Sequence, residues 1–277
     1  MPTVKQQTRR KEPVLEGGGV VSRIAPVHLE EHGIKMSVYG RSGTGKTTFM
    51  STWPKPLLHI ICSSAGLGEM RSIYNVKGID AVEIRRPVEF DELVAHAKDT
   101  GKYKTVCLDH VTGFSDMVLG AILGLEKLPE QSAWGLAQQQ DYAKLGLQLK
   151  EYMRGLLDLD CNVIINGQER EFNTDNESDL IMPNVGTALT PSVAGWLNTA
   201  CDYICQTYIK QRTEEKERKV AGKSITTRQR VDGVEYCLRV GPHSVFTTKF
   251  RLPKGHSLPE YITDPTYKEV NKLIKGE

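Results

Sequence analysis

The sequence is poor in the features that mark membrane, secreted and strongly charged proteins. It has no run of about 18 apolar residues, so we expect no membrane-spanning helix. Residues 1–17 are polar and basic and contain no apolar stretch, so we expect no secretory signal there. The formal net charge is +2, which means that any basic surface must be local. These features favour a protein of the cytoplasm with no membrane partner.

Cysteine also lacks the spacing of common metal and redox motifs. The sequence has six cysteines, and no two of them form a C-x-x-C pair. Some of them fall in stretches that read as buried strands. We therefore expect reduced structural thiols, and a metal site or a disulfide framework is the alternative.

The remaining composition is that of an ordinary globular protein, with 39% hydrophobic and 25% charged residues. A chain of 277 residues forms one large domain or two small ones. Residues 1–26 contain a short basic cluster and three consecutive glycines with little periodicity, and they read as a flexible basic tail. Residues 27–277 are then expected to form the main domain.

The most informative motif lies at residues 40–47, where GRSGTGKT fits the P-loop pattern G-x-x-x-x-G-K-[ST]. Its glycines let the backbone curl so that amide groups point at phosphate oxygens. Lys46 supplies charge for the β- and γ-phosphates, and the Thr47 hydroxyl can ligate Mg²⁺. A glycine-rich surface turn is the alternative, but a predicted strand precedes the loop and a predicted helix follows it, which offers free amides to phosphate. The expected nucleotide-binding residues are Gly40, Arg41, Ser42, Gly43, Thr44, Gly45, Lys46, Thr47 and Thr48.

Strands and helices alternate after the tail, which is typical of a parallel sheet covered by helices. The stretches 105–108 and 163–165 are almost entirely apolar, as expected of strands buried on both faces. In the longest predicted helix an apolar stripe that includes Tyr142 and Leu145 recurs at helical spacing, and we assign it to the core. Strands are predicted at 34–39, 57–62, 81–84, 104–109 and 162–166, and helices at 89–99, 136–158 and 265–275.

From about residue 200 the pattern changes to strands without helices between them. Asp232-Gly233 is a favourable two-residue hairpin turn. The predicted fold class is α/β, with a mainly parallel central sheet, antiparallel strands that extend it towards the C-terminus and a β-hairpin around 209–230. The C-terminal extended stretches are 201–210, 225–231, 234–240 and 244–250.

A P-loop ATPase needs a second carboxylate that holds Mg²⁺ through water, at the end of an apolar strand beside the P-loop strand. The run Val106-Cys107-Leu108-Asp109 gives that pattern, so we predict that Asp109 acts on the metal with Thr47. The alternative, in which Asp109 caps the next helix, is weaker because the apolar run ends abruptly there. His110 beside it either contacts a phosphate or catalytic water or is a packed histidine.

The chain resembles the RecA-like P-loop ATPases. The resemblance lies in the order of four segments: Gly40–Thr48, Asp109, Asn166-Gly167-Gln168 and Lys249-Phe250-Arg251. Over residues 30–265 the chain is most similar to phage-type AAA/RecA-like proteins that accompany single-strand annealing and recombination. The resemblance implies a RecA-like core that uses ATP and Mg²⁺, acts on single-stranded DNA and assembles into a ring or filament. It also implies a host-cytoplasmic location if the protein is phage-encoded, and a single-strand-binding or recombination protein as a partner.

The resemblance assigns roles to polar residues near the strand ends. Gln168 would be the sensor that couples the γ-phosphate to a DNA-binding loop, and a simple polar residue at a strand end is the alternative. RecA-like enzymes place a water-activating glutamate just after the second strand, where this chain has Ser64. Glu69 is the nearest carboxylate and would need a changed loop to serve. Binding and hydrolysis of ATP are therefore separate hypotheses.

Lys249 and Arg251 lie two residues apart on a predicted strand, so their side chains leave the same face. In RecA-like rings and filaments such a K-x-R pair reaches the γ-phosphate of the neighbouring subunit and stabilises its charge. A solvated face is the alternative. If the finger interpretation holds, the working unit is an oligomer.

Several segments are candidates for contact with DNA, and for each of them a role in structure alone is the alternative. Residues 209–230 carry many lysines and arginines interrupted by glutamates, and form either a cationic arm for a phosphate backbone or a solvated hairpin. Trp134, within 125–140, either stacks on a base or lies in the core. The segment 169–186 is acidic, which argues against direct binding of phosphates there.

The sequence leaves two functional hypotheses and disfavours a third. The first is an oligomeric RecA-like ATPase that acts on single-stranded DNA in recombination or replication. The second is a nucleotide-gated binding or assembly protein that barely hydrolyses ATP. A small-molecule kinase is disfavoured because no arginine-rich lid follows the long helix and the C-terminal half is rich in strands. ATP is favoured over GTP by the resemblance.

Overall fold

The computed structural model describes residues 33–62, 66–125, 137–172, 183–220 and 223–277, and within 214–229 it describes the backbone. The predicted tail at 1–26, Ser64 and Trp134 lie outside these ranges. Gly33–Glu277 forms one compact unit. Within the described ranges, no helix is long and apolar enough to cross a lipid bilayer.

A mixed sheet forms the centre of this unit, with the strand order β11-β9-β8-β1-β5-β4-β2-β3. The strand β5 lies between β1 and β4, so the strand that ends in Asp109 is not next to the strand that leads into the P-loop. The prediction that these two strands are neighbours is therefore wrong. The parallel strands on this side are β1 (Lys35–Tyr39), β2 (Leu57–Ile61), β3 (Ile79–Glu83), β4 (Thr105–Asp109) and β5 (Asn162–Gly167).

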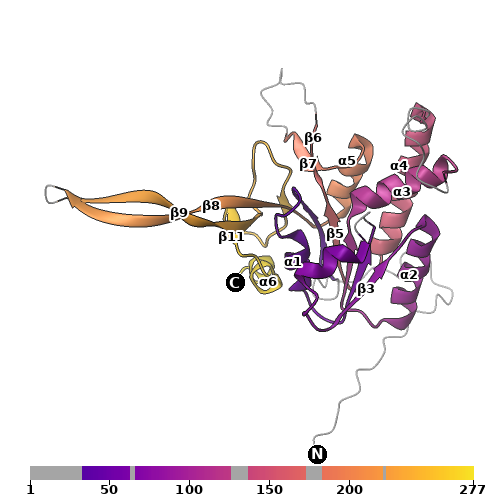
Figure 1. Ribbon diagram of the computed structural model, residues 1–277, viewed down its shortest axis with the longest axis horizontal. Helices are drawn as coiled ribbons and strands as arrows, with labels where there is room; N and C mark the ends of the chain where they lie inside the picture. Colours follow the sequence, from indigo (N-terminus) through magenta and orange to yellow (C-terminus); the bar gives the residue numbers. More distant parts are fainter. Residues whose placement is uncertain (1–32, 63–65, 126–136, 173–182, 221–222) are drawn as a thin grey trace, which may run out of the picture. The chain divides into compact units, whose positions relative to one another are not determined.

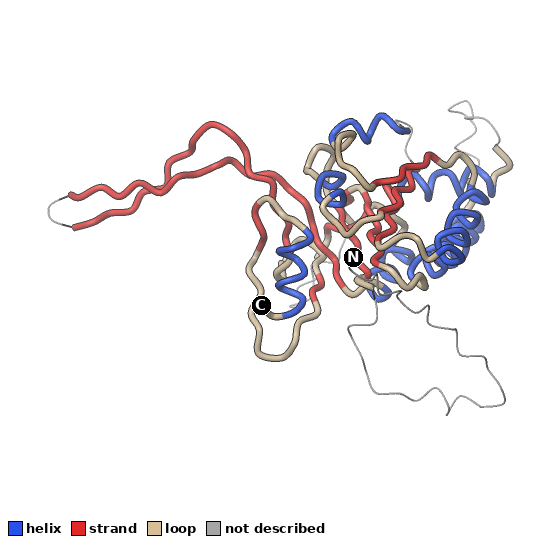
Figure 2. Tube along the Cα trace, turned by 90° about the horizontal axis from the view of Figure 1, so that it is seen from below, coloured by secondary structure: helices blue, strands red, loops and turns tan. Residues whose placement is uncertain are grey.

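Alternate residues of these buried strands contribute to two apolar cores, one on each face of the sheet. Figure 2 shows the helices, in blue, on both sides of the strands, in red. Val106 and Leu108 belong to the core that several helices cover. Cys107, between them, belongs to the other core together with residues of the P-loop helix. The first face is covered by α2 (Pro87–Thr100), α3 (Val111–Ile122), α4 (Gln139–Leu157) and α5 (Pro191–Ala200), and the second by α1 (Lys46–Ser51) and α6 (Tyr267–Lys275).

Three details of the helices differ from the sequence expectation. The helices α3 and α5 were not predicted, because glycines and polar residues interrupt their apolar pattern. The helix α4 begins at Gln139 instead of 136, and its first buried residue is Leu145. Tyr142 is therefore 46% exposed and does not belong to the core.

Two long strands, β8 (Tyr203–Val220) and β9 (Lys223–Arg239), extend the sheet beyond β1. The strand β8 pairs with β1 in parallel over 203–206 and antiparallel with β9 as far as Val220. We call the outer segment Thr213–Arg230 the arm; it is the orange ribbon that leaves the sheet in Figure 1. The expected antiparallel extension is thus confirmed.

The predicted hairpin turn at Asp232-Gly233 is wrong. Both residues lie inside β9, opposite a register shift between Gln211 and Thr213. The Gln211 side chain donates to the carbonyl oxygens of Val231 and Gly233 at 2.7 and 3.3 Å. A bulge of this kind accepts the same glycine with positive φ (109°) that a tight turn accepts, so local sequence does not separate the two.

Among the described residues, the remaining elements are one 3₁₀ helix and several short strands. Gly66–Ser72 forms a 3₁₀ helix, and β6 (Glu169–Glu171) pairs with β7 (Val185–Thr187). The extended stretch predicted at 244–250 forms a strand, β10, over Lys249–Phe250 alone among its described residues. The strand β11 (Tyr261–Thr263) pairs with β9 and leads into α6.

Candidate functional site

The P-loop is held in its curled shape by backbone conformation and by contact with β8. Gly43 and Gly45 have positive φ angles of 79° and 85°, a region that other residues rarely adopt. A side chain at Gly40 would lie 2.3 Å from the carbonyl oxygen of Thr207, so glycine is required there. The hydroxyl groups of Thr44 and Thr207 are 2.7 Å apart, which joins the loop to β8.

The ammonium group of Lys46 lies within its own loop. It donates to the carbonyl oxygens of Gly40 and Arg41 at 2.8 and 2.7 Å. Burial lowers the pKa of Lys46, and the nearby carboxylates of Asp109 and Glu69 oppose that shift. A buried cation at the start of a helix is suited to an anionic ligand with several oxygens.

Asp109, which is 2% exposed, is contacted from three other elements. Its Oδ2 accepts a hydrogen bond from Thr47 Oγ1 at 3.0 Å and lies 3.1 Å from Nε2 of His59. Its Oδ1 accepts from the amide nitrogen of Asn166. Burial raises the pKa of Asp109, but the hydrogen bonds from His59 and Thr47 outweigh this and leave the pKa below its ordinary value. Asp109 is therefore a buried anion that faces the P-loop helix.

A cavity of about 620 Å³ opens beside the P-loop. It has room for a nucleotide, since ligand pockets typically enclose about 300–1,000 Å³. The loop and the end of the parallel strands form one wall, and the inner part of β9 with the start of α6 forms another. The lining residues from outside the P-loop include Glu69, Asp109, His110, Asn166, Gln168, Tyr236, Asp264 and Thr266.

The structure brings four of the six predicted catalytic residues to this cavity: Lys46, Asp109, Gln168 and Glu69. Gln168 follows β5, and its backbone amide donates to Thr112 Oγ1 at 3.3 Å. Glu69 lies on the 3₁₀ helix after β2, close enough to Lys46 to influence its pKa. Their roles in sensing and in water activation stay predictions.

Lys249 and Arg251 lie away from this cavity. Lys249 Nζ donates to the carbonyl oxygens of Asn198, Thr199 and Cys201 at 2.9, 3.2 and 2.6 Å, at the end of α5. Arg251 pairs with Asp202 at 2.8 Å. Both residues are beside the start of β8, whereas the P-loop follows the end of β1, which runs parallel to β8. Within one subunit they cannot act on the P-loop cavity, so a trans-acting role stays a prediction.

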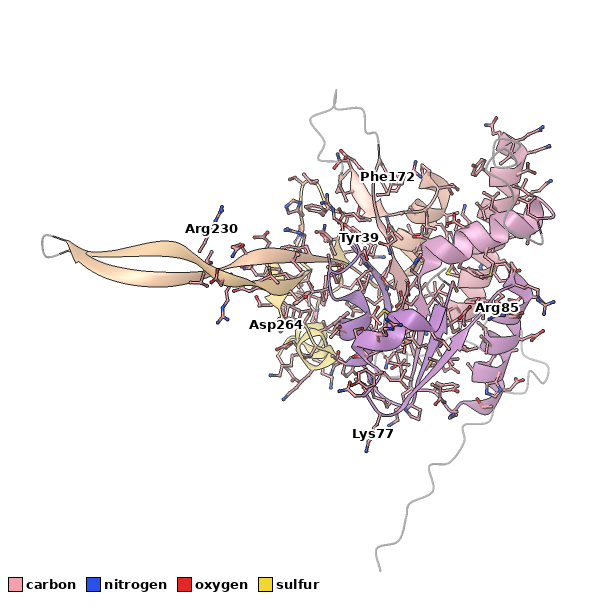
Figure 3. The ribbon with its side chains drawn as sticks, in the orientation of Figure 1. Tyr39, Lys77, Arg85, Phe172, Arg230 and Asp264 are labelled. Carbon is pink, nitrogen blue, oxygen red and sulfur yellow. The ribbon has the colours of Figure 1, made fainter. Side chains whose placement is uncertain are left out.

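Sequence reasoning assigned no role to three residues that line the cavity, Asn166, Tyr236 and Asp264, or to His59, which contacts Asp109. His59 is the one polar residue in β2, and this interruption of an apolar strand was the available signal. Tyr236 and Asp264 come from the distant C-terminal strands. The backbone amide of Asp264 donates to the carbonyl oxygen of Tyr236 at 2.7 Å, and Asp264 itself has a positive φ of 46°. Figure 3 shows Asp264 beside α6, below the base of the two long strands.

The donor set fits Mg²⁺ bound with a nucleotide. Thr47 and Asp109 offer hard oxygen atoms, which Mg²⁺ prefers. Among the described residues, no group of three or more His, Cys, Asp or Glu side chains is placed to hold a metal. Two protein oxygens suit a metal that takes its other ligands from phosphates and water.

A family model described as an AAA domain matches residues 32–252, which is most of the chain. The chain belongs to this AAA domain family. The match spans the P-loop, Asp109 and the arm. Membership of the family, together with the site, supports nucleotide binding and ATPase chemistry. The predicted α/β fold, with a mainly parallel sheet and antiparallel strands that extend it, is confirmed by the structure. The narrower kinship with phage-type annealing proteins stays a prediction.

Two solved structures are similar to most of the chain at low sequence identity. The flagellar accessory protein FlaH from Methanocaldococcus jannaschii is 10% identical and has a TM-score of 0.39, and the match covers 84% of this chain and 85% of that chain. The KaiC-like protein PH0186 from Pyrococcus horikoshii OT3 is 11% identical and has a TM-score of 0.41, with 84% and 90% covered. No curated protein matches the sequence.

Proposed function

We propose that this chain binds ATP with Mg²⁺ in the P-loop cavity and hydrolyses it, as an oligomer that acts on single-stranded DNA in recombination or replication. One observation carries the nucleotide part of the proposal. Thr47 and Asp109 are 62 positions apart in the sequence, yet their side chains are hydrogen-bonded at the edge of the cavity that Lys46 also lines. Such convergence is expected of a metal–triphosphate site.

Each part of the site has a task that follows from its chemistry. The amides of the P-loop and the ammonium group of Lys46 would bind phosphate oxygens, once Lys46 exchanges its loop carbonyls for them. Thr47 and Asp109 would hold Mg²⁺, which when bound neutralises phosphate charge and polarises the phosphoryl group. Gln168 and Glu69 line the same cavity and are the candidates for orienting the attacking water.

Nucleotide binding is tested by calorimetry with magnesium-ATP on the wild type and on Lys46→Ala. We expect binding in the wild type and its loss in the variant, because the buried cation of the site is removed. Lys77→Ala, at a residue outside the cavity, is the matched control and should bind like the wild type. A wild type that gives no heat with magnesium-ATP would refute the proposal.

The DNA part of the proposal rests on the charge of the arm and on the family resemblance. The arm, Thr213–Arg230, holds six lysines and arginines against three glutamates. On a paired two-stranded segment, these cations could follow a phosphate backbone. We expect single-stranded DNA to stimulate ATP turnover, and gel filtration with a non-hydrolysable analogue to show an oligomer. Turnover that single-stranded DNA leaves unchanged would count against this part.

A second candidate function is a nucleotide-gated binding or assembly protein with little hydrolysis. It is motivated by Glu69, the nearest carboxylate after β2, which lies on a 3₁₀ helix instead of directly at the strand end. Under this hypothesis ATP changes assembly or DNA affinity while turnover stays very low. Steady turnover near the enzyme median of about 10 per second would exclude it.

A further inference from the structure

His59 is a buried polar residue in the middle of an apolar strand, and the proposed chemistry does not use it. It is 0% exposed, and its neighbours in β2 are leucines and isoleucines. The parallel register pairs His59 with Cys107, two residues before Asp109 on β4. Side chains two apart on a strand share a face, so His59 and Asp109 both lie on the face that α1 covers.

The contact between the two side chains fixes which ring nitrogen carries hydrogen. Nε2 of His59 lies 3.1 Å from Oδ2 of Asp109. An ionised carboxylate can only accept hydrogen bonds, so Nε2 must donate. On the other side, the amide nitrogen of Asn166 donates to Oδ1. Asp109 is therefore held between donors from the two neighbouring strands, β2 and β5.

Core filling is a poor explanation for a histidine at this place. Within the described residues, the other ring nitrogen, Nδ1, is buried without a hydrogen-bond partner. Leaving a buried polar atom unpaired costs about 1–3 kcal/mol, which a leucine of similar size would avoid. The polar contact that His59 does make is to Asp109, so the histidine is best explained by what it does to that carboxylate.

We propose that His59 is a positioning residue for Asp109: its Nε2–H holds the carboxylate towards Thr47 and thereby sets the affinity for the metal–nucleotide complex. His59 is not among the residues that line the cavity, so it acts through Asp109 and not on the nucleotide. This inference rests on the proposed nucleotide function. Partners that orient metal-binding residues in this way typically change metal affinity by about 10–100-fold when they are removed.

The test compares nucleotide affinity with Mg²⁺ and with EDTA, measured by calorimetry with ADP. Affinity for ADP without metal depends on the P-loop and Lys46. The increase in affinity when Mg²⁺ is added, which we call the gain, depends on Thr47 and Asp109. In His59→Leu we expect the gain to fall about tenfold or more, with metal-free affinity within about twofold of the wild type. His59→Gln keeps a donor of similar reach and should retain most of the gain. Leu57→Met, on the same face of β2, should behave like the wild type.

Each other outcome has a definite meaning. A His59→Leu variant with the wild-type gain overturns the inference, and so does one in which both affinities fall by the same factor. If His59→Leu does not fold, as judged by circular dichroism, His59→Gln and His59→Asn decide, because the shorter asparagine should lose the gain that glutamine keeps. Equal gains in these two variants overturn the inference. A wild type that binds no magnesium nucleotide refutes the proposed function itself.

Discussion

At the scale of single residues, Tyr236 illustrates how the inner part of β9 meets the P-loop. Its ring lies against Gly45, where an added side chain would come within 3.1 Å of it. The ring also lines the cavity and is 42% exposed. A flat aromatic surface at the mouth of a phosphate site is suited to stacking on a nucleotide base.

We therefore predict that Tyr236→Ala weakens ATP binding by about tenfold, while Tyr236→Phe binds like the wild type, because base stacking is worth roughly 1–3 kcal/mol. Tripolyphosphate, which has no base, should bind both variants equally. Competition binding of ATP and tripolyphosphate measures this. An alanine variant that loses affinity for both ligands to the same extent would show that the ring supports the loop and not the base.

The residues that the sequence identified are those with a fixed local pattern. The P-loop residues and Asp109 could be predicted because their spacing or their place at the end of an apolar run follows from chemistry. The roles of His59, Asn166 and Tyr236 could not be predicted, because each depends on contact with a segment that is distant in sequence. The register His59–Cys107 and the pairing of β4 with β5 decide which side chains surround Asp109, and a single sequence does not show register.

At the scale of elements, Lys249 connects β10 to the end of α5. Its ammonium group satisfies three of the carbonyl oxygens that a helix leaves free at its C-terminus. Arg251, by contrast, forms an ion pair with Asp202, and the Arg251 side chain is 60% exposed. The two residues thus contribute differently to the subunit, although their spacing in the sequence suggested a common role.

Lys249→Met should lower the free energy of unfolding by about 1–3 kcal/mol, since the methionine keeps the apolar stem but leaves the partly buried carbonyls of Asn198 and Cys201 without this donor. Arg251→Ala should lower it by no more than about 1 kcal/mol, as for other exposed ion pairs. Urea unfolding followed by circular dichroism checks both values. A large loss of turnover in Arg251→Ala with unchanged stability and ATP affinity would support the trans-acting finger.

At the scale of the whole molecule, the arm is a two-stranded segment whose strands pair with each other. Beyond Gln206, β8 pairs with β9, and in the part of the chain that is described the arm has no partner strand other than its own second half. Figure 3 shows Arg230 on the arm, away from the helices that cover the sheet. Removal of the arm should therefore leave the core and its cavity intact.

Replacement of residues 214–229 by Asn-Gly would close the hairpin directly after the Thr213–Arg230 pair. We expect this variant to bind magnesium-ATP within about twofold of the wild type and to lose about tenfold or more of its affinity for single-stranded DNA, with a weaker dependence on salt. Fluorescence anisotropy at two salt concentrations measures this. A full-length arm with glutamines in place of its lysines and arginines is the control; DNA binding that survives in it would show that charge is not the cause.

The position of β5 between β1 and β4 has a consequence for how the protein must be made. Thr47 and Asp109 are both synthesised early, but the strand that keeps their own strands at the right separation ends at Gly167. A nascent chain that stops before that point contains Thr47 and Asp109 but lacks β5, the strand that lies between β1 and β4. The nucleotide pocket is thus a late product of folding that depends on contacts between remote segments, and ligand binding during translation would report the moment at which the sheet closes.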